Sequence, residues 1–117
     1  MRVSSEKINS AVKKEILDLL FQIFADTKNI KEAGSLLTDI LSEAELISIA
    51  KRVAIAYYLS KGQSYSQIKK ALKISSATIS EIQSQSKKEG FKIALRKIEN
   101  NEWAEKWEKK IKSLFGK

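Results

Sequence analysis

The chain contains no cysteine, no histidine and no proline. Without cysteine and histidine it lacks disulfides, thiolate nucleophiles, imidazole bases and the usual nitrogen and sulfur ligands of transition metals. Neither a clustered pair of carboxylates nor a glycine-rich phosphate loop takes their place. We therefore predict a protein that is not an enzyme and that carries no cofactor and no metal.

Helix-breaking residues are scarce, because proline is absent and glycine occurs only four times in 117 residues. Hydrophobic residues make up 43% and charged residues 31%, which is the balance of a folded domain rather than of a disordered chain. A chain of this length suits one hydrophobic core. We predict an all-α fold in a single helical domain, residues 1–117.

The sequence shows neither a secretion signal nor a membrane span. It begins directly with a charged amphipathic pattern. Its most apolar stretch, residues 16–25, is short and is interrupted by Asp18 and Gln22. We therefore expect a cytoplasmic protein.

The net charge of +8 lies in the second half of the chain. Residues 1–42 carry equal numbers of basic and acidic side chains, whereas residues 43–86 carry +3 and residues 87–117 carry +5. A basic surface binds polyanions by releasing their counterions, so nucleic acid is the first expected partner and an anionic membrane surface the second. A solvated, lysine-rich surface without any polyanion partner is the plain alternative.

Apolar residues recur at spacings of three and four from Ile8 to Phe24, which predicts a long amphipathic helix capped at Ser4-Ser5. At about 1.5 Å per residue this helix is about 30 Å long, more than the core of so small a domain needs. Part of its apolar stripe is therefore expected to pack against another chain.

Two further helices are predicted within residues 1–62, which we expect to form the scaffold and the dimerisation surface. The second helix follows Asn29, and the third begins at a capping box formed by Ser42 and Glu45 and ends at Gly62. The expected apolar face of the third helix consists of Leu46, Ile49, Ala50, Val53, Ala56 and Tyr57, with either Leu59 or Tyr58 as a further member.

Residues 63–86 have the pattern of a helix-turn-helix. A capping box at Ser64 and Gln67 opens a short helix, and Ser75 or Ser76 caps the next one after a tight break. The residues expected to face inward are Ile68, Leu72, Ile74, Ile79 and Ile82. Those expected outside are Lys69, Lys70, Lys73, Ser76, Thr78, Ser80 and Glu81. Two ordinary bundle helices joined by a polar turn would give the same pattern.

Several stretches between residues 36 and 82 are similar to the Trp repressor superfamily, and more closely to its YerC/YecD-type relatives. They are residues 36–38, 42–46, 50–53, 59–62, 65–68 and above all 76–80, which read Ser-Ala-Thr-Ile-Ser. The resemblance implies an intertwined homodimer that binds double-stranded DNA, with two reading heads in successive major grooves. It implies a sequence-specific transcriptional regulator, which we expect to be a repressor.

The resemblance also implies which residues contact DNA. Lys69 of the bracing helix would bind phosphate, and Ala77 and Thr78 suit a thymine methyl and a hydroxyl contact. Lys70 and Lys73 are expected to add phosphate contacts. The residues at the family's DNA-contacting positions are Tyr65, Ser66, Lys69, Ser76, Ala77, Thr78 and Ser80, where Ser66 replaces an arginine of the Trp repressor.

In the Trp repressor, the indole of the ligand lies between two arginines. Arg52 matches the first, but Glu81 stands at the position of the second. A carboxylate there repels the carboxylate of the ligand and removes one stacking plane. We therefore predict a vestigial ligand pocket at Arg52 and Glu81 and no small-molecule corepressor, which leaves Arg52 as a surface or helix-end cation.

The basic tail, residues 87–117, carries Trp103 and Trp107 four residues apart. Aromatic residues at this spacing usually belong to a core. The surrounding lysines also suit an acidic partner helix, whereas the glutamates among them argue against a membrane. The alternative to DNA binding is therefore a helical protein-interaction module whose basic tail docks an acidic partner.

Overall fold

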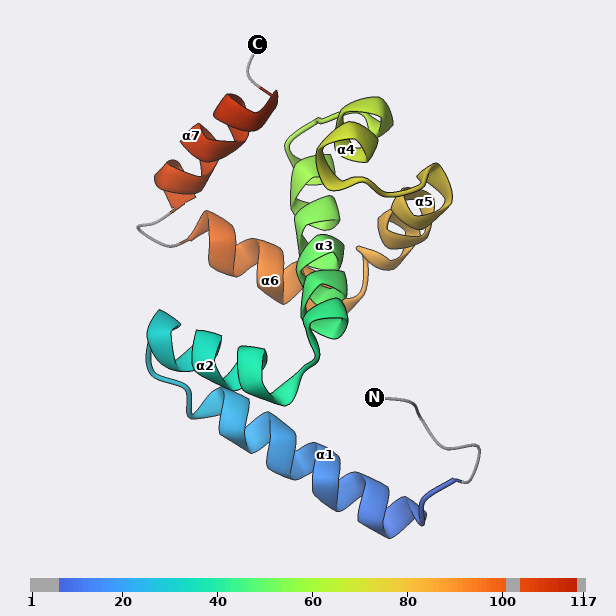
Figure 1. Cartoon of the computed structure of the whole chain (residues 1–117), viewed down its shortest axis with the longest axis vertical. Coiled ribbons are helices and arrows are strands. Elements are labelled where there is room, and N and C mark those ends of the chain that lie inside the picture. Colours follow the sequence, from blue (N-terminus) through green and yellow to red (C-terminus); the bar gives the residue numbers. More distant parts are fainter. Residues whose placement is uncertain (1–6, 101–103, 116–117) are drawn as a thin grey trace. The chain divides into compact units, whose positions relative to one another are not determined.

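The structure is a computed structural model that describes residues 7–100 and 104–115. Those residues form α-helices joined by short turns, with no β-strand among them (Figure 1). The helices are α1 (Ser10–Ala25), α2 (Ile30–Ile40), α3 (Glu43–Ser60), α4 (Tyr65–Leu72), α5 (Ser76–Gln85), α6 (Glu89–Glu99) and α7 (Ala104–Phe115). The predicted all-α fold is confirmed.

Local hydrogen bonds set the starts of α3 and α4. The Ser42 hydroxyl accepts from the Glu45 backbone N–H at 3.1 Å, and the Glu45 carboxylate accepts from the Ser42 N–H at 2.7 Å. The bond from the Ser42 N–H lowers the pKa of the Glu45 carboxyl. Ser64 and Gln67 form the same reciprocal pair at the start of α4. Both predicted capping boxes are confirmed, and such caps contribute about 1 kcal/mol each.

Asparagine caps the first two helices. The Asn9 side chain accepts from the Ala11 N–H at 2.7 Å and begins α1, whereas the cap predicted at Ser4-Ser5 lies outside the described residues. Asn29 begins α2 as predicted, because its side chain accepts from the Glu32 N–H at 2.9 Å.

Left-handed residues end α3 and α4. Gly62 has a φ of 82°, as predicted, and the next residue, Gln63, donates its N–H back to the Tyr58 carbonyl at 3.1 Å. Lys73, the C-cap of α4, has a φ of 54°, a conformation that costs a non-glycine residue about 1 kcal/mol. Gly62 lies just before α4 and Lys73 just after it, and the two residues permit the sharp turns on either side of that helix.

The contacts along the chain group into two compact units, Met1–Leu46 and Ile47–Lys117. In the second unit, α3, α4 and α5 share a core in which four isoleucines have an exposed fraction of 0%. Burying one such side chain contributes about 1.5–3 kcal/mol. The buried core residues are Ile55, Ala56, Ile68, Ile79 and Ile82.

The expected apolar face of α3 is wrong in part. Ile55 is fully buried although it does not belong to that expected face, whereas Ile49 and Val53 are 45% and 37% exposed. Because α3 is apolar on nearly every side from Ile47 to Leu59, its periodicity does not single out a buried face. The neighbouring helices α4 and α5 decide which side is covered.

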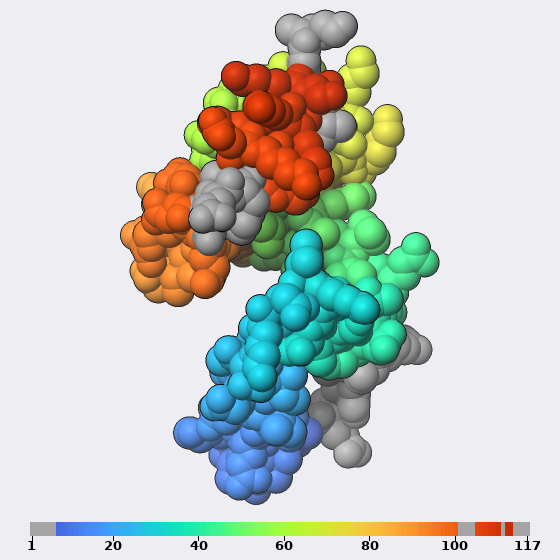
Figure 2. Space-filling model, turned by 90° about the vertical axis from the view of Figure 1, so that its left-hand side faces the viewer, coloured from blue at the N-terminus to red at the C-terminus, as the bar shows by residue number. Residues whose placement is uncertain are grey.

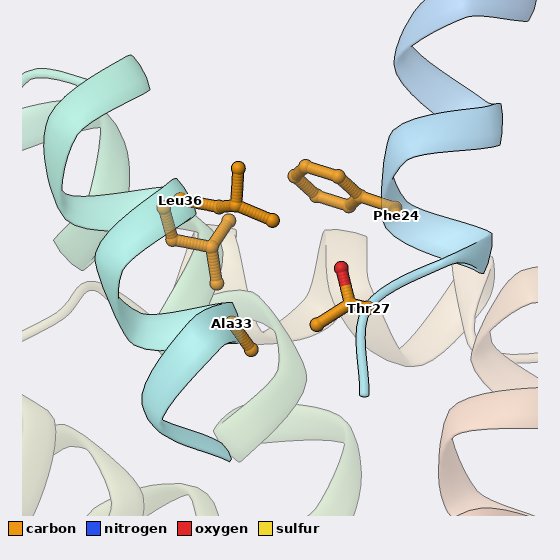
Figure 3. A pocket seen from close by; sticks show the side chains of 5 residues that line it. Phe24, Thr27, Ala33 and Leu36 are labelled. Atoms are coloured by element: carbon orange, nitrogen blue, oxygen red, sulfur yellow. The ribbon is translucent and has the colours of Figure 1, made fainter. Parts of the chain in front are cut away.

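In the first unit, the end of α1 and the middle of α2 surround a hollow of about 110 Å³ (Figure 3). It is lined by Phe24, Thr27, Ala33, Leu36 and Leu37, so its walls are almost entirely apolar. Small-molecule sites usually measure about 300–1,000 Å³ and contain several polar groups. The hollow is therefore a packing gap between two helices rather than a ligand site.

Gly90 lies inside the first turn of α6 and does not interrupt that helix. Among the described residues, none of the helices has both the length and the apolar character needed to cross a bilayer.

Candidate nucleic-acid interface

The helices α4 and α5 form the predicted helix-turn-helix. Ser75 is the N-cap of α5, where its hydroxyl accepts from the Thr78 N–H at 3.2 Å. Ile68, Ile79 and Ile82 face the core as predicted. The expected inner residues Leu72 and Ile74 are half-buried and pack against that core. The two helices therefore pack side by side on a shared core (Figure 1).

The outer side of α5 carries small side chains. Ser76, Ala77, Ser80 and Ser84 are all exposed. A major groove about 12 Å wide admits an α-helix closely only where the side chains facing its floor are short. This side of α5 therefore has a shape that suits insertion into the groove.

Thr78 is less exposed than its predicted outward position implied. Its side chain is half-buried, and its hydroxyl lies 3.0 Å from the Ser75 hydroxyl. The reason is its place one turn before Ile82, on the edge of the buried side of α5. Any contact between Thr78 and DNA must therefore be made by the exposed part of the Thr78 side chain.

A tyrosine links the two helices of this unit. The half-buried Tyr65, at the start of α4, donates its phenol O–H to the Gln83 side chain of α5. The neighbouring Ser66 is exposed. Tyr65 therefore has a positioning role toward α5. No local pattern in the sequence points to Gln83, which is 18 residues away.

Arg52 of α3 reaches α5 through a second glutamine. Its guanidinium donates to the Gln85 side-chain oxygen at 2.6 Å, and the Gln85 amide donates to the Glu81 carboxylate at 3.4 Å. Arg52 is half-buried, lies within α3 and not at a helix end, and is bonded to α5. Gln85 therefore connects Arg52 to Glu81.

The charged side chains of this region are all positive. From Leu46 to Ser80 the chain carries six Lys or Arg residues and no Asp or Glu. Lys69, Lys70 and Lys73 are exposed, as predicted. Such a field raises the local concentration of a polyanion such as DNA.

Residues 15–99 match the family described as Trp repressor protein. The chain belongs to the Trp repressor family. Among curated proteins and solved structures, none matches it. The family comprises helix-turn-helix regulators that bind DNA, so this Trp repressor family member is a DNA-binding regulator and not an enzyme.

The match to the Trp repressor family extends from within α1 to the last residue of α6. It includes α3, α4 and α5 with their core, so the family match covers the whole helix-turn-helix and the helix that packs against it. Helix α7 lies outside the matched residues. Trp107 of α7 is exposed, whereas Trp103 lies outside the described residues.

Proposed function

We propose that this regulator binds a specific double-stranded DNA site as a homodimer and represses transcription in the cytoplasm, and that it is closest to the YerC/YecD-type group. The observation that supports the proposal most strongly is the outer surface of α4 and α5. Short polar side chains on α5 lie beside exposed lysines of α4, in a stretch that has no acidic residue before Glu81. Shape and charge therefore both suit the major groove.

In this proposal the two helices have different tasks. Lys69, with Lys70 and Lys73, binds phosphates and fixes the position of the protein on the duplex. Tyr65 and Ser66 approach the backbone from the start of α4. The residues that read base edges are Ser76, Ala77, Thr78 and Ser80.

The homodimer is supported by the exposed apolar surface of α1. No residue of α1 is buried, and Leu19 and Phe21 are each 61% exposed. Contiguous apolar surface of this kind marks an interface in soluble proteins. A second copy of the chain is the occupant that fits best, because two reading heads related by a two-fold axis bind successive half-sites.

We propose that the regulator works without tryptophan. The guanidinium of Arg52 is bonded to Gln85, and Glu81 adds a carboxylate on the same side of α5. An amino-acid ligand would have to break the bond between Arg52 and Gln85 and approach a negative charge. Both steps cost free energy.

Selection from random duplexes tests the proposed function. The full-length protein is mixed with a library of random duplex DNA, and bound fragments are recovered over several rounds. We expect an enriched site of two inverted half-sites whose centres are about 10 base pairs, or a multiple of that, apart. If the protein retained DNA at low salt but no sequence was enriched, sequence-specific binding would be contradicted. An enriched site that contained a single half-site would contradict the homodimer.

A further inference from the structure

Two glutamines of α5 are hydrogen-bonded to side chains of neighbouring helices. The phenol O–H of Tyr65 in α4 donates to the Gln83 side-chain oxygen, and the guanidinium of Arg52 in α3 donates to the Gln85 side-chain oxygen at 2.6 Å. These bonds join residues 18 and 33 apart, so neither is a product of local helix geometry. Helix α5 is therefore tied by a directional contact to each of the two helices beside it.

The two glutamines lie on opposite flanks of the buried side of α5. At about 100° per residue, Gln83 and Gln85 project about 160° apart around the helix axis, and the buried Ile79 and Ile82 lie between them. The small exposed side chains occupy the other arc; they are Ser76, Ala77, Ser80 and Ser84. Each glutamine therefore stands at a border between the side of α5 that packs on the core and the side that is proposed to read DNA.

In the part of the chain that the structure describes, the outer side of α5 is uncovered, because its small side chains are exposed. Figure 1 shows α7 across α3 from α5, and Figure 2 shows α7 on the face that is turned toward the viewer from that side. Helix α7 therefore does not hold α5 from outside. The contacts that orient α5 must come from its buried side and from its two borders.

The isoleucines alone constrain the rotation of α5 about its own axis less sharply than hydrogen bonds do. Apolar contact has no preferred direction, whereas a hydrogen bond weakens steeply as its angle departs from linearity. Side chains reach about 5–6 Å from the helix axis, so a roll of about 10° moves their ends by about 1 Å. A binding site must hold its groups within roughly 0.5 Å. Two bonds on opposite flanks resist such a roll in both directions.

We propose that Gln83 and Gln85 are positioning residues that determine which DNA sequence α5 reads, without contacting the bases themselves. The inference rests on the proposed DNA-binding function. Their anchors are well placed, because Tyr65 packs against the core and Arg52 is half-buried in α3. When either bond is lost, the lysines of α4 still attract DNA, but α5 meets the base edges in more than one orientation. Specificity then falls while general affinity remains.

The test measures the ratio of the affinity for the selected site to the affinity for a random duplex, with the full-length protein. Gln83→Ala and Gln85→Ala each remove one bond, whereas Gln83→Glu and Gln85→Glu each keep an oxygen that can accept it. The charge that a glutamate adds weakens binding to both duplexes, so it largely cancels in the ratio. Gln22→Ala is the matched control, because it removes the same side chain from an exposed position of α1.

We expect each alanine variant to lower this ratio by about fivefold or more, which is the lower end of what one base contact contributes. The affinity for the random duplex and the slope of log affinity against log salt should stay unchanged, because phosphate contacts supply both. The glutamate variants should recover most of the ratio, and Gln22→Ala should match the wild type.

A second comparison separates positioning from direct reading, since Gln83 is exposed. Tyr65→Phe removes the donor of the bond and leaves Gln83 in place, so it also tests this bond if Gln83→Ala loses helix content. Coupled residues give non-additive effects. The double variant should therefore lose no more of the ratio than either single variant. Additive losses would show that Gln83 touches DNA itself and would end its positioning role.

Three further results would overturn the inference. Unchanged ratios in both alanine variants would mean that the apolar core alone orients α5. Equal weakening on the selected and the random duplex would reduce the glutamines to a general role in folding. Glutamate variants as poor as the alanine variants would show that the accepting oxygen is not what matters. If the wild type binds both duplexes equally, the proposed function itself fails, which is a different outcome.

Discussion

Among single residues, Gln85 takes part in the most consequential contact of the reading helix. It joins Arg52 of α3 to Glu81 on its own helix, and the bond from Arg52 measures 2.6 Å. A charge-assisted bond in a half-buried place is worth about 1.5–3 kcal/mol. Together with the bond between Tyr65 and Gln83, it fixes the angle of α5 from two sides. The chain itself thus supplies contacts that orient the reading helix.

This bond predicts that tryptophan has no effect. In a thermal melt with millimolar L-tryptophan, and in a DNA titration with the same addition, we expect no change from the protein alone. L-phenylalanine serves as the control ligand. A ligand present at 100 times its Kd would stabilise the protein by about 2.7 kcal/mol, which is readily measured. A melting temperature raised by L-tryptophan but not by L-phenylalanine would show that the pocket is functional.

Among the helices, α1 has no buried residue. Its large apolar side chains from Val12 to Phe24 are all exposed. The ion pair of Lys14 with Asp18, at 2.8 Å, lies on its polar side. Surface ion pairs of this kind contribute at most about 1 kcal/mol, so the stability of α1 must come from burying its apolar side.

A single charge on that apolar side should separate the dimer. We expect Leu19→Glu to sediment as a monomer of 13.2 kDa, because burying an unpaired carboxylate at the interface costs several kcal/mol. Gln22→Glu adds the same residue on the polar side and should leave twice that mass. Monomers of the unchanged protein at micromolar concentration would contradict the proposed homodimer.

How much of these elements is predictable depends on how far apart the contacting residues are in sequence. The capping boxes at Ser42 and Ser64 and the turn at Gly62 are predictable, because each depends on residues at most five apart. The bonds to Gln83 and Gln85 are not, because they join residues 18 and 33 apart. No periodicity in a single helix encodes such distances.

The candidate site shows the same division. The outward lysines of α4 and the inward isoleucines of both helices follow from helical spacing alone. The sequence relates Arg52 to a pocket only by resemblance, and its bond to Gln85 appears only in the folded chain. The half-burial of Thr78 likewise depends on the Ser75 hydroxyl and on the packing around Ile82.

For the whole molecule, affinity and specificity for DNA have separate sources. The net charge of +8 attracts any duplex, and at about 0.1 M salt this attraction fades over about 10 Å. In the proposed function, only side chains of α5 that touch base edges distinguish one sequence from another. Removing a lysine that binds phosphate therefore weakens binding to all DNA, whereas removing a side chain that reads a base weakens binding to one site.

The central claim is that α5 reads bases while α4 holds the backbone. It is tested most directly by measuring Thr78→Ala and Lys69→Ala on the selected site and on random DNA across a salt series. We expect Thr78→Ala to cost about 1–3 kcal/mol on the selected site and little on random DNA. Lys69→Ala should weaken both and lower the salt slope by about one unit. Equal weakening by Thr78→Ala on both DNAs, or no weakening on either, would contradict the assignment of α5 as the reading helix.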